Sequence, residues 1–256
     1  MTESPSRRSQ QQPPGAIGAT GRHMEQLALS LPRREALGRA DFFVSDSNAA
    51  ALEWIDRWPQ WPAPALILYG PSGAGKTHLA RLWCQRARAS LVAGEALGPA
   101  QVERILDDSG VNLVVDDCDK APPIALLHLF NASAEAGAGL LLTARRAPAD
   151  WRLMLPDLGS RLRAAPSVGI GGPDDALLGA VLAKHFADRQ LRVDPEVIAY
   201  LVSHMERSLS AAAEIAAALD QASLQRRRPI TIPLASRTLG VRAAQLASPD
   251  SDAGVA

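Results

Sequence analysis

The most informative segment of the sequence is Leu66-Ile67-Leu68-Tyr69-Gly70-Pro71-Ser72-Gly73-Ala74-Gly75-Lys76-Thr77. This segment begins with an apolar run, which favours a buried strand. The residues after the whole segment have the period of an amphipathic helix. Residues 70–77 match the pattern G-x-x-x-x-G-K-[ST], in which glycines let backbone N–H groups point at phosphates. We therefore predict a phosphate-binding loop between a strand and a helix.

Each part of this loop has an expected role. Residues 70–75 should surround the phosphates of a nucleotide, and Lys76 should pair with the β- and γ-phosphates. The Thr77 hydroxyl should hold Mg²⁺, and His78, which follows directly, is a further candidate for nucleotide contact. The alternative is a glycine-rich turn that binds nothing.

A second motif, residues 112–117, places two acids after an apolar run. Acids in this position belong to the second half of a phosphate-loop site. Asp116 is expected to bind Mg²⁺ through water, and Asp117 to orient or deprotonate the attacking water. The alternative is an ordinary polar strand end.

The pattern outside these motifs predicts two folded domains. Strands are expected at residues 65–69, 90–93, 111–116, 140–143 and 167–170, with helices at 47–58, 75–89, 99–108, 123–136 and 150–163. Apolar strands that alternate with helices predict a parallel sheet in an α/β domain, residues 41–172, with helices on both faces. A small helical domain, residues 173–240, should hold helices at 173–189, 194–205 and 208–227 and a short element at 230–239.

Composition limits the remaining possibilities. Residues 1–22 are polar and rich in Pro and Gly, so we expect disorder there, followed by a linker at 23–40; a polar tail is expected at 241–256. Because 27 basic residues balance 27 acidic ones, no basic field is available to hold DNA. The two cysteines are too few for a disulfide framework. The sequence has no apolar run of about 18 residues and no signal peptide, so we expect a soluble, cytoplasmic protein.

Residues 42–48, Phe42-Phe43-Val44-Ser45-Asp46-Ser47-Asn48, carry a family resemblance. They resemble the F-V-x-x-x-S-N segment of the replication initiator DnaA, and the chain is similar to DnaA-related AAA+ regulators of the Hda family. The resemblance implies an AAA+ fold with a small helical lid, and ADP or ATP with Mg²⁺ as ligands. It also implies that Phe43 and Val44 flank the adenine, although both could simply pack in the core.

Three more positions match motifs of that family. Residues 157–162 resemble the L-x-S-R-[LF] box, whose arginine reaches the nucleotide of a neighbouring subunit; Arg161 is the match, or else a surface arginine. Arg207 matches the lid arginine called sensor 2. Thr143 fits the sensor 1 region, although the following Ala144-Arg145 departs from the Ser-Asp that the initiator often has.

Residues 26–31, Gln26-Leu27-Ala28-Leu29-Ser30-Leu31, resemble the Q-L-x-L-x-L peptide with which Hda-type proteins bind the sliding clamp, the β subunit of DNA polymerase III. Gln26 would enter a polar pocket, and leucines including Leu29 and Leu31 an apolar cleft. The alternative is packing on the chain's own core. We expect no direct sequence-specific DNA binding, because the sequence after residue 239 is short for the initiator's helix-turn-helix domain and the net charge is zero.

Three functions follow as hypotheses. In the first, the protein binds nucleotide and the clamp and promotes hydrolysis of DnaA-bound ATP through Arg161, which inhibits initiation of replication. In the second, a nucleotide-gated adaptor recruits another replication factor to the clamp. The third is a stand-alone P-loop ATPase. The partners expected are thus the clamp and DnaA, with a homo-oligomer as a further possibility and no membrane.

Overall fold

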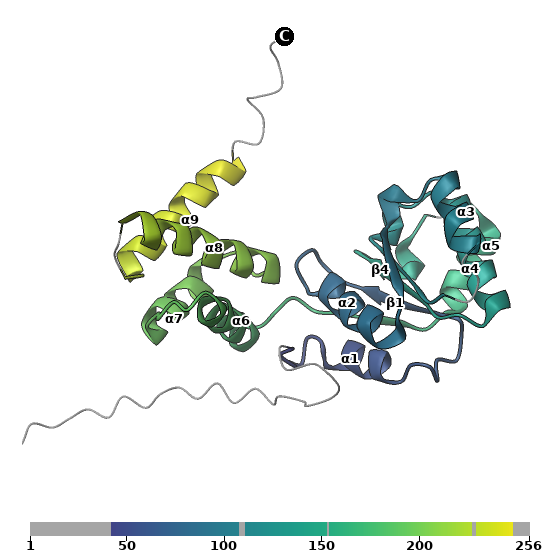
Figure 1. The fold of residues 1–256 in the computed structure, drawn as a ribbon, viewed down its shortest axis with the longest axis horizontal. Coiled ribbons are helices and arrows are strands. Elements are labelled where there is room, and N and C mark those ends of the chain that lie inside the picture. The colour runs from purple at the N-terminus through teal and green to yellow at the C-terminus, as the bar shows by residue number, and fades with distance from the viewer. Residues whose placement is uncertain (1–41, 108–110, 153, 227–228, 248–256) are drawn as a thin grey trace, which may run out of the picture.

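The computed structural model describes residues 42–107, 111–152, 154–226 and 229–247. They form an α/β domain and a bundle of helices, and an extended segment of residues 170–174 joins the two (Figure 1). None of the described helices is both long enough and apolar enough to cross a membrane.

The α/β domain contains a parallel sheet of five strands in the order β2-β3-β4-β1-β5. The strands are β1 (Ala65–Tyr69), β2 (Ser90–Ala93), β3 (Leu113–Asp116), β4 (Leu140–Ala144) and β5 (Ser167–Gly169). Strands β1 and β4 are buried along nearly their whole length, which explains their unbroken apolar sequences. The predicted parallel sheet is confirmed.

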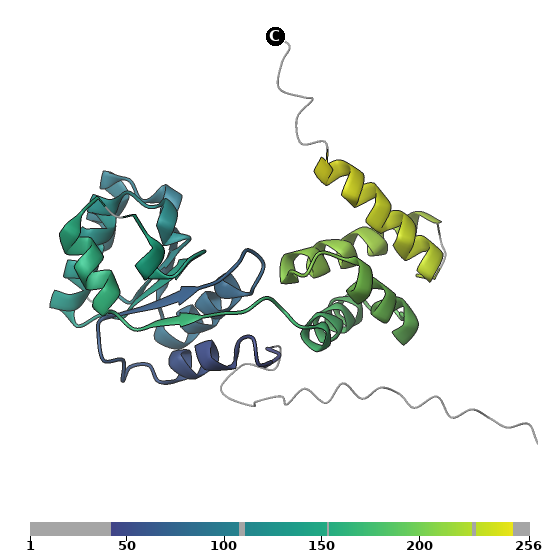
Figure 2. The same cartoon turned by 180° about the vertical axis from the view of Figure 1, so that it is seen from behind.

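Helices cover both faces of the sheet (Figures 1 and 2). The helices of this domain are α1 (Ala49–Asp56), α2 (Lys76–Ala87), α3 (Pro99–Asp107), α4 (Pro123–Ala136) and α5 (Pro156–Ala164). Because side chains alternate along a strand, Leu66 of β1 packs with α1 and α2, whereas Ile67 packs with α3, α4 and α5. Each face therefore has its own apolar core.

The helical bundle consists of α6 (Asp175–Asp188), α7 (Pro195–His204), α8 (Leu209–Arg226) and α9 (Ile232–Ala247), and we call it the lid. It has a separate core, in which Phe186 and Leu201 are buried. The Asp174 carboxylate accepts a hydrogen bond of 2.7 Å from the Leu177 N–H and so caps α6. Pro195 is the first residue of α7, as the sequence predicted.

Some predicted boundaries were wrong. The helix expected at 150–163 begins only at Pro156, because Leu155 is extended and proline suits a first helical turn. A separate turn, η3 (Pro148–Asp150), precedes it. The last element is a full helix that continues to Ala247 rather than ending at residue 239, because the residues that follow are mostly good helix formers.

Two asparagine side chains explain why a strand and a helix begin later than predicted. The strand expected from residue 111 begins at Leu113, because the Asn112 amide bridges the Ala87 carbonyl and the Gly139 N–H at 2.7 Å each. The helix expected from residue 47 begins at Ala49, because the Asn48 side chain bonds to the backbone of Phe43 and Ser45. Polar side chains that bond to the backbone favour turns over regular elements.

Candidate nucleotide-binding site

The phosphate loop connects β1 to α2 at the carboxyl edge of the sheet (Figure 1). At Gly70 the chain passes so close to the Ile170 carbonyl that any Cβ would overlap it. Gly73 has a φ of 72°, in the left-handed region that side chains rarely adopt. These two glycines are thus required by geometry, as expected for a loop that turns its amides inward.

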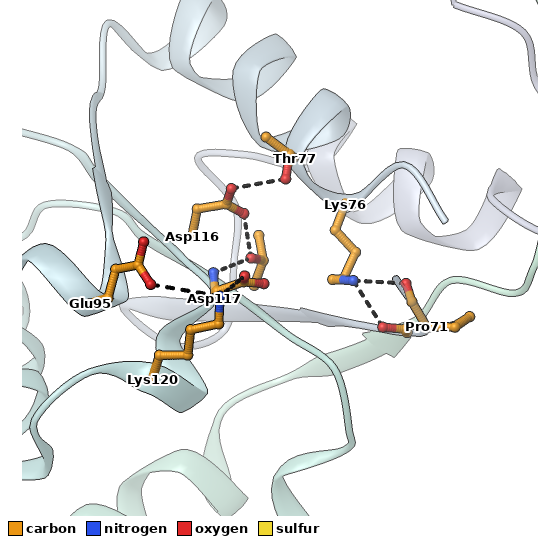
Figure 3. Close-up of polar contacts among 9 residues, drawn as sticks. Pro71, Lys76, Thr77, Glu95, Asp116, Asp117 and Lys120 are labelled. Carbon is orange, nitrogen blue, oxygen red and sulfur yellow. Dashed lines mark hydrogen bonds and ion pairs between the residues drawn. The ribbon is translucent and has the colours of Figure 1, made fainter. Parts of the chain in front are cut away.

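Lys76 lies folded onto its own loop. Its ammonium donates hydrogen bonds of 2.9 Å to the carbonyl oxygens of Gly70 and Pro71 (Figure 3), and the residue is only 6% exposed. Burial lowers the pKa of Lys76, and the charges of Asp117 and Asp116 oppose that change. The result is a shielded cation at the base of the loop.

Three predicted residues meet beside the loop. The Thr77 hydroxyl donates to Asp116 Oδ2 at 2.8 Å (Figure 3), and the buried Thr143 hydroxyl donates to the other oxygen, Oδ1, at 2.5 Å. Strand pairing explains the second contact, because Val115 lies opposite Leu142 and the following residues therefore lie side by side. The structure thus brings together residues from three separate sequence motifs.

Asp117 adopts a backbone conformation that the sequence did not reveal. Its φ is 52°, and its N–H donates to the Thr143 hydroxyl at 2.8 Å. Lys120 makes an ion pair of 2.9 Å with the Asp117 carboxylate and lies 3.9 Å from Glu95 (Figure 3). The hydrogen bond to Asp117 raises the pKa of Lys120. Sequence reasoning missed Lys120, since nothing in the motif points to it.

A hydroxyl and a carboxylate 2.8 Å apart suit a hard divalent cation. Magnesium is commonly held by one or two protein oxygens, water and substrate phosphates. Thr77 and Asp116 therefore fit the predicted Mg²⁺ ion. Within the part of the chain that the structure describes, no group of three His, Cys, Asp or Glu residues offers a metal site of another kind.

The loop borders a cavity of about 290 Å³. Its lining residues come from both domains and are Ser72, Gly73, Gly75, Lys76, Thr77, Asp117, Arg145, Leu209 and Ser210. The sequence did not predict Arg145, Leu209 or Ser210. Arg145 could have been noticed as a cation at the carboxyl end of a central strand, whereas only the placement of the lid brings the other two to the cavity.

The lid touches the loop directly. The N–H of Leu209, the first residue of α8, donates to the Gly73 carbonyl at 2.9 Å. Ser208 is buried at this contact, and its hydroxyl accepts from the Ala211 N–H at 3.1 Å. The start of α8 therefore closes one side of the cavity.

Two predicted arginines lie elsewhere. Arg207 pairs with Asp175 at 2.6 Å and also reaches the Pro173 carbonyl at 3.4 Å, so it contacts the segment between the domains. Arg161 pairs with Asp157 at 3.1 Å and lies 6.0 Å above the Phe130 ring. Neither arginine lines the cavity, and their contacts with nucleotide stay predictions.

The candidates for base contact also lie outside the cavity lining. Phe43 and Val44 are half-buried, and Val44 packs against the core around α1 and α2. The His78 ring stacks on the buried Phe42, with centroids 5.5 Å apart. The peptide of residues 26–31 lies outside the described residues, so its role also stays a prediction.

Comparison with known proteins agrees with this architecture. Residues 175–239 match the family model of the Hda lid domain. An uncharacterized protein of Haemophilus influenzae is 28% identical over 216 residues, which are 78% of this chain and 92% of that protein. Domain III of Thermotoga maritima DnaA superposes with a TM-score of 0.63 at 18% identity, over 78% of this chain and 93% of that domain.

AMPPCP-bound DnaA from Aquifex aeolicus has a TM-score of 0.61 at 18% identity, over 81% of this chain and 69% of that one. The chain spans 66% of a further DNA replication initiation factor, so it corresponds to about two thirds of these longer proteins. At such identities the solved structures establish the fold, and the family model establishes the type of lid. The chain thus has an Hda-type lid at residues 175–239 and shares its overall fold with domain III of DnaA.

Proposed function

We propose that the chain binds ADP or ATP with Mg²⁺ in the cavity beside the phosphate loop. The observation that carries this proposal is the meeting of Thr77, Asp116 and Thr143 next to the loop. Loop amides and Lys76 would bind the phosphates, while Thr77 and Asp116 would hold the ion. The ion supplies positive charge that neutralises phosphate oxygens. Adenine is the proposed base because a DnaA of the same fold binds AMPPCP.

The proposed role is regulatory. The protein docks on the sliding clamp through residues 26–31 and meets ATP-bound DnaA. Arg161 then completes the nucleotide site of DnaA and promotes hydrolysis there, which inhibits initiation of replication. We infer a role in trans because the Arg161 side chain is 39% exposed and lies outside the cavity of its own subunit. Its partner Asp157 is 59% exposed, so their ion pair costs little to break.

The decisive experiment measures hydrolysis of DnaA-bound ATP with and without clamp loaded on DNA. We expect stimulation by the wild type, and loss of at least about a hundredfold of it in Arg161→Ala, since such arginines contribute about 10³–10⁵ in rate. Arg163→Ala is the matched control, because Arg163 is an exposed arginine of the same helix, α5. Full stimulation by Arg161→Ala would remove this residue from the mechanism.

Clamp binding needs its own test. Replacement of Gln26, Leu29 and Leu31 by Ala should abolish retention on immobilised clamp and leave nucleotide affinity unchanged. Stimulation of DnaA should then no longer depend on loaded clamp. Unchanged retention by this variant would refute the assignment of residues 26–31.

A further inference from the structure

Arg145 is a cation at the proposed nucleotide site that pairs with none of the residues that the structure describes. Its side chain lines the cavity together with Lys76, Thr77 and Asp117. In the described segments, no hydrogen bond or ion pair involves its guanidinium, which is exposed. An arginine in a cleft whose guanidinium has no such contact is available to bind an anion.

The sheet explains why Arg145 lies there. It follows β4, the central strand, directly, and the N–H of Gly70 donates to the carbonyl of the preceding Ala144 at 3.1 Å. On its other side β4 pairs with β3, which ends at Asp116. Arg145 therefore leaves the sheet between the base of the phosphate loop and the acidic pair.

Both carboxylates of the acidic pair are already engaged. Asp116 accepts hydrogen bonds from Thr77 and Thr143, and Asp117 pairs with Lys120. Burial is the largest cause of the lowered pKa of Lys76, and the positive charge of Arg145 lowers it further. The two cations therefore interact electrostatically. Since Asp116 and Asp117 are bonded to other groups, a ligand that pairs with Arg145 must bring its own negative charge.

We propose that Arg145 binds the terminal phosphate of the nucleotide, as a second cation beside Lys76. This inference rests on the proposed nucleotide binding and adds a residue to it. The planar guanidinium donates two parallel N–H groups, which match two oxygens of one phosphate. That terminal phosphate is the β-phosphate of a diphosphate or the γ-phosphate of a triphosphate.

Calorimetric titration with ADP and with AMPPCP, each with Mg²⁺, tests this inference in the full-length protein. We expect Arg145→Gln to bind at least one of the two ligands about ten- to a hundredfold more weakly, as for loss of a charge-assisted hydrogen bond. Arg145→Lys should recover part of the loss, because it keeps the charge and loses the fork. Arg146→Gln is the matched control, since Arg146 is its exposed neighbour but does not line the cavity.

The two ligands distinguish the phosphates. A loss confined to AMPPCP assigns Arg145 to the γ-phosphate of a triphosphate, and one confined to ADP assigns it to the β-phosphate of a diphosphate. A loss for both ligands assigns it to the terminal phosphate of each. Affinities of Arg145→Gln within twofold of the wild type for both ligands would overturn the inference while the proposed nucleotide binding stands. A wild type that binds neither ligand would instead refute nucleotide binding itself, and this inference with it.

Discussion

The N–H of Leu209 donates a hydrogen bond of 2.9 Å to the carbonyl oxygen of Gly73, so the first residue of a lid helix is bonded to the phosphate loop. The first N–H groups of a helix have no partner inside the helix. Here one of them is satisfied by the loop, which ties the position of the lid to the shape of the site.

The first prediction concerns Gly73→Ala. A Cβ at this position would overlap Ser208, and φ is 72°. We expect a loss of stability of about 1–2 kcal/mol from the left-handed backbone, together with a loss of nucleotide binding as the lid is displaced. Urea unfolding and titration with a fluorescent nucleotide measure the two effects.

Gly137→Ala is the control for that variant. Gly137 has a similar φ of 64°, yet among the described residues no atom outside its immediate chain neighbours lies within 4 Å of where its Cβ would stand. It should lose similar backbone stability and keep full nucleotide affinity. If Gly73→Ala also kept its affinity, the contact between lid and loop would have no role in binding.

The second prediction concerns Thr143, which is fully buried and bonds to both acids of the site. Thr143→Val keeps the shape but leaves Asp116 and the Asp117 N–H without this partner. We expect a loss of about 1–3 kcal/mol in the free energy of unfolding, because buried polar groups without partners are costly. Thr143→Ser retains the hydroxyl and should recover most of the loss. If Thr143→Val kept its stability while Thr143→Ser lost it, the methyl group and not the hydroxyl would matter.

The third prediction is a pH dependence in the protein without ligand. Burial lowers the pKa of Lys76 below its ordinary value of 10.5, so the folded state binds this proton less tightly than the unfolded state. Stability should therefore rise relative to Lys76→Met as pH increases from below the lowered pKa toward 10.5. Urea unfolding of both proteins across the alkaline range measures the difference. A difference that stays constant or falls with pH would contradict the assigned shift.

The fourth prediction concerns the Arg207–Asp175 pair, whose side chains are 57% and 70% exposed. If Arg207 contacts nucleotide as the family resemblance implies, Asp175 competes for it. Asp175→Asn should then raise nucleotide affinity up to about fivefold, because exposed ion pairs contribute about 0–1 kcal/mol. Asp188→Asn, at the other end of α6, breaks a comparable pair with Lys184 and should change nothing. A lower affinity in Asp175→Asn would count against this competition.

Much of the site could be predicted because its signals are local. The glycine spacing before Lys76 and the two acids after Val115 depend on a few consecutive residues. Their meeting in space follows from a parallel sheet, because the carboxyl ends of such strands share one edge. Thr143 could be placed by the same argument, since it lies near the end of a predicted strand.

Helix boundaries were less predictable, because single side chains decide them. Asn48 and Asn112 each bond to backbone groups and delay the element that follows. Such bonds compete with the regular pattern, and the average propensity of a segment does not reveal them. Pro156 likewise determines where α5 begins.

The amino-acid sequence alone is enough to predict the phosphate loop, the parallel sheet and the separate lid, because glycine spacing and apolar periodicity act through the nearest neighbours in the chain. Three other contacts depend on the folded chain: Leu209 bonds to Gly73, Arg207 contacts Asp175, and Arg145 lines the cavity without a partner among the described residues. These contacts join residues between 32 and 136 positions apart or depend on where a whole domain lies, and packing between domains leaves no periodic trace in the sequence.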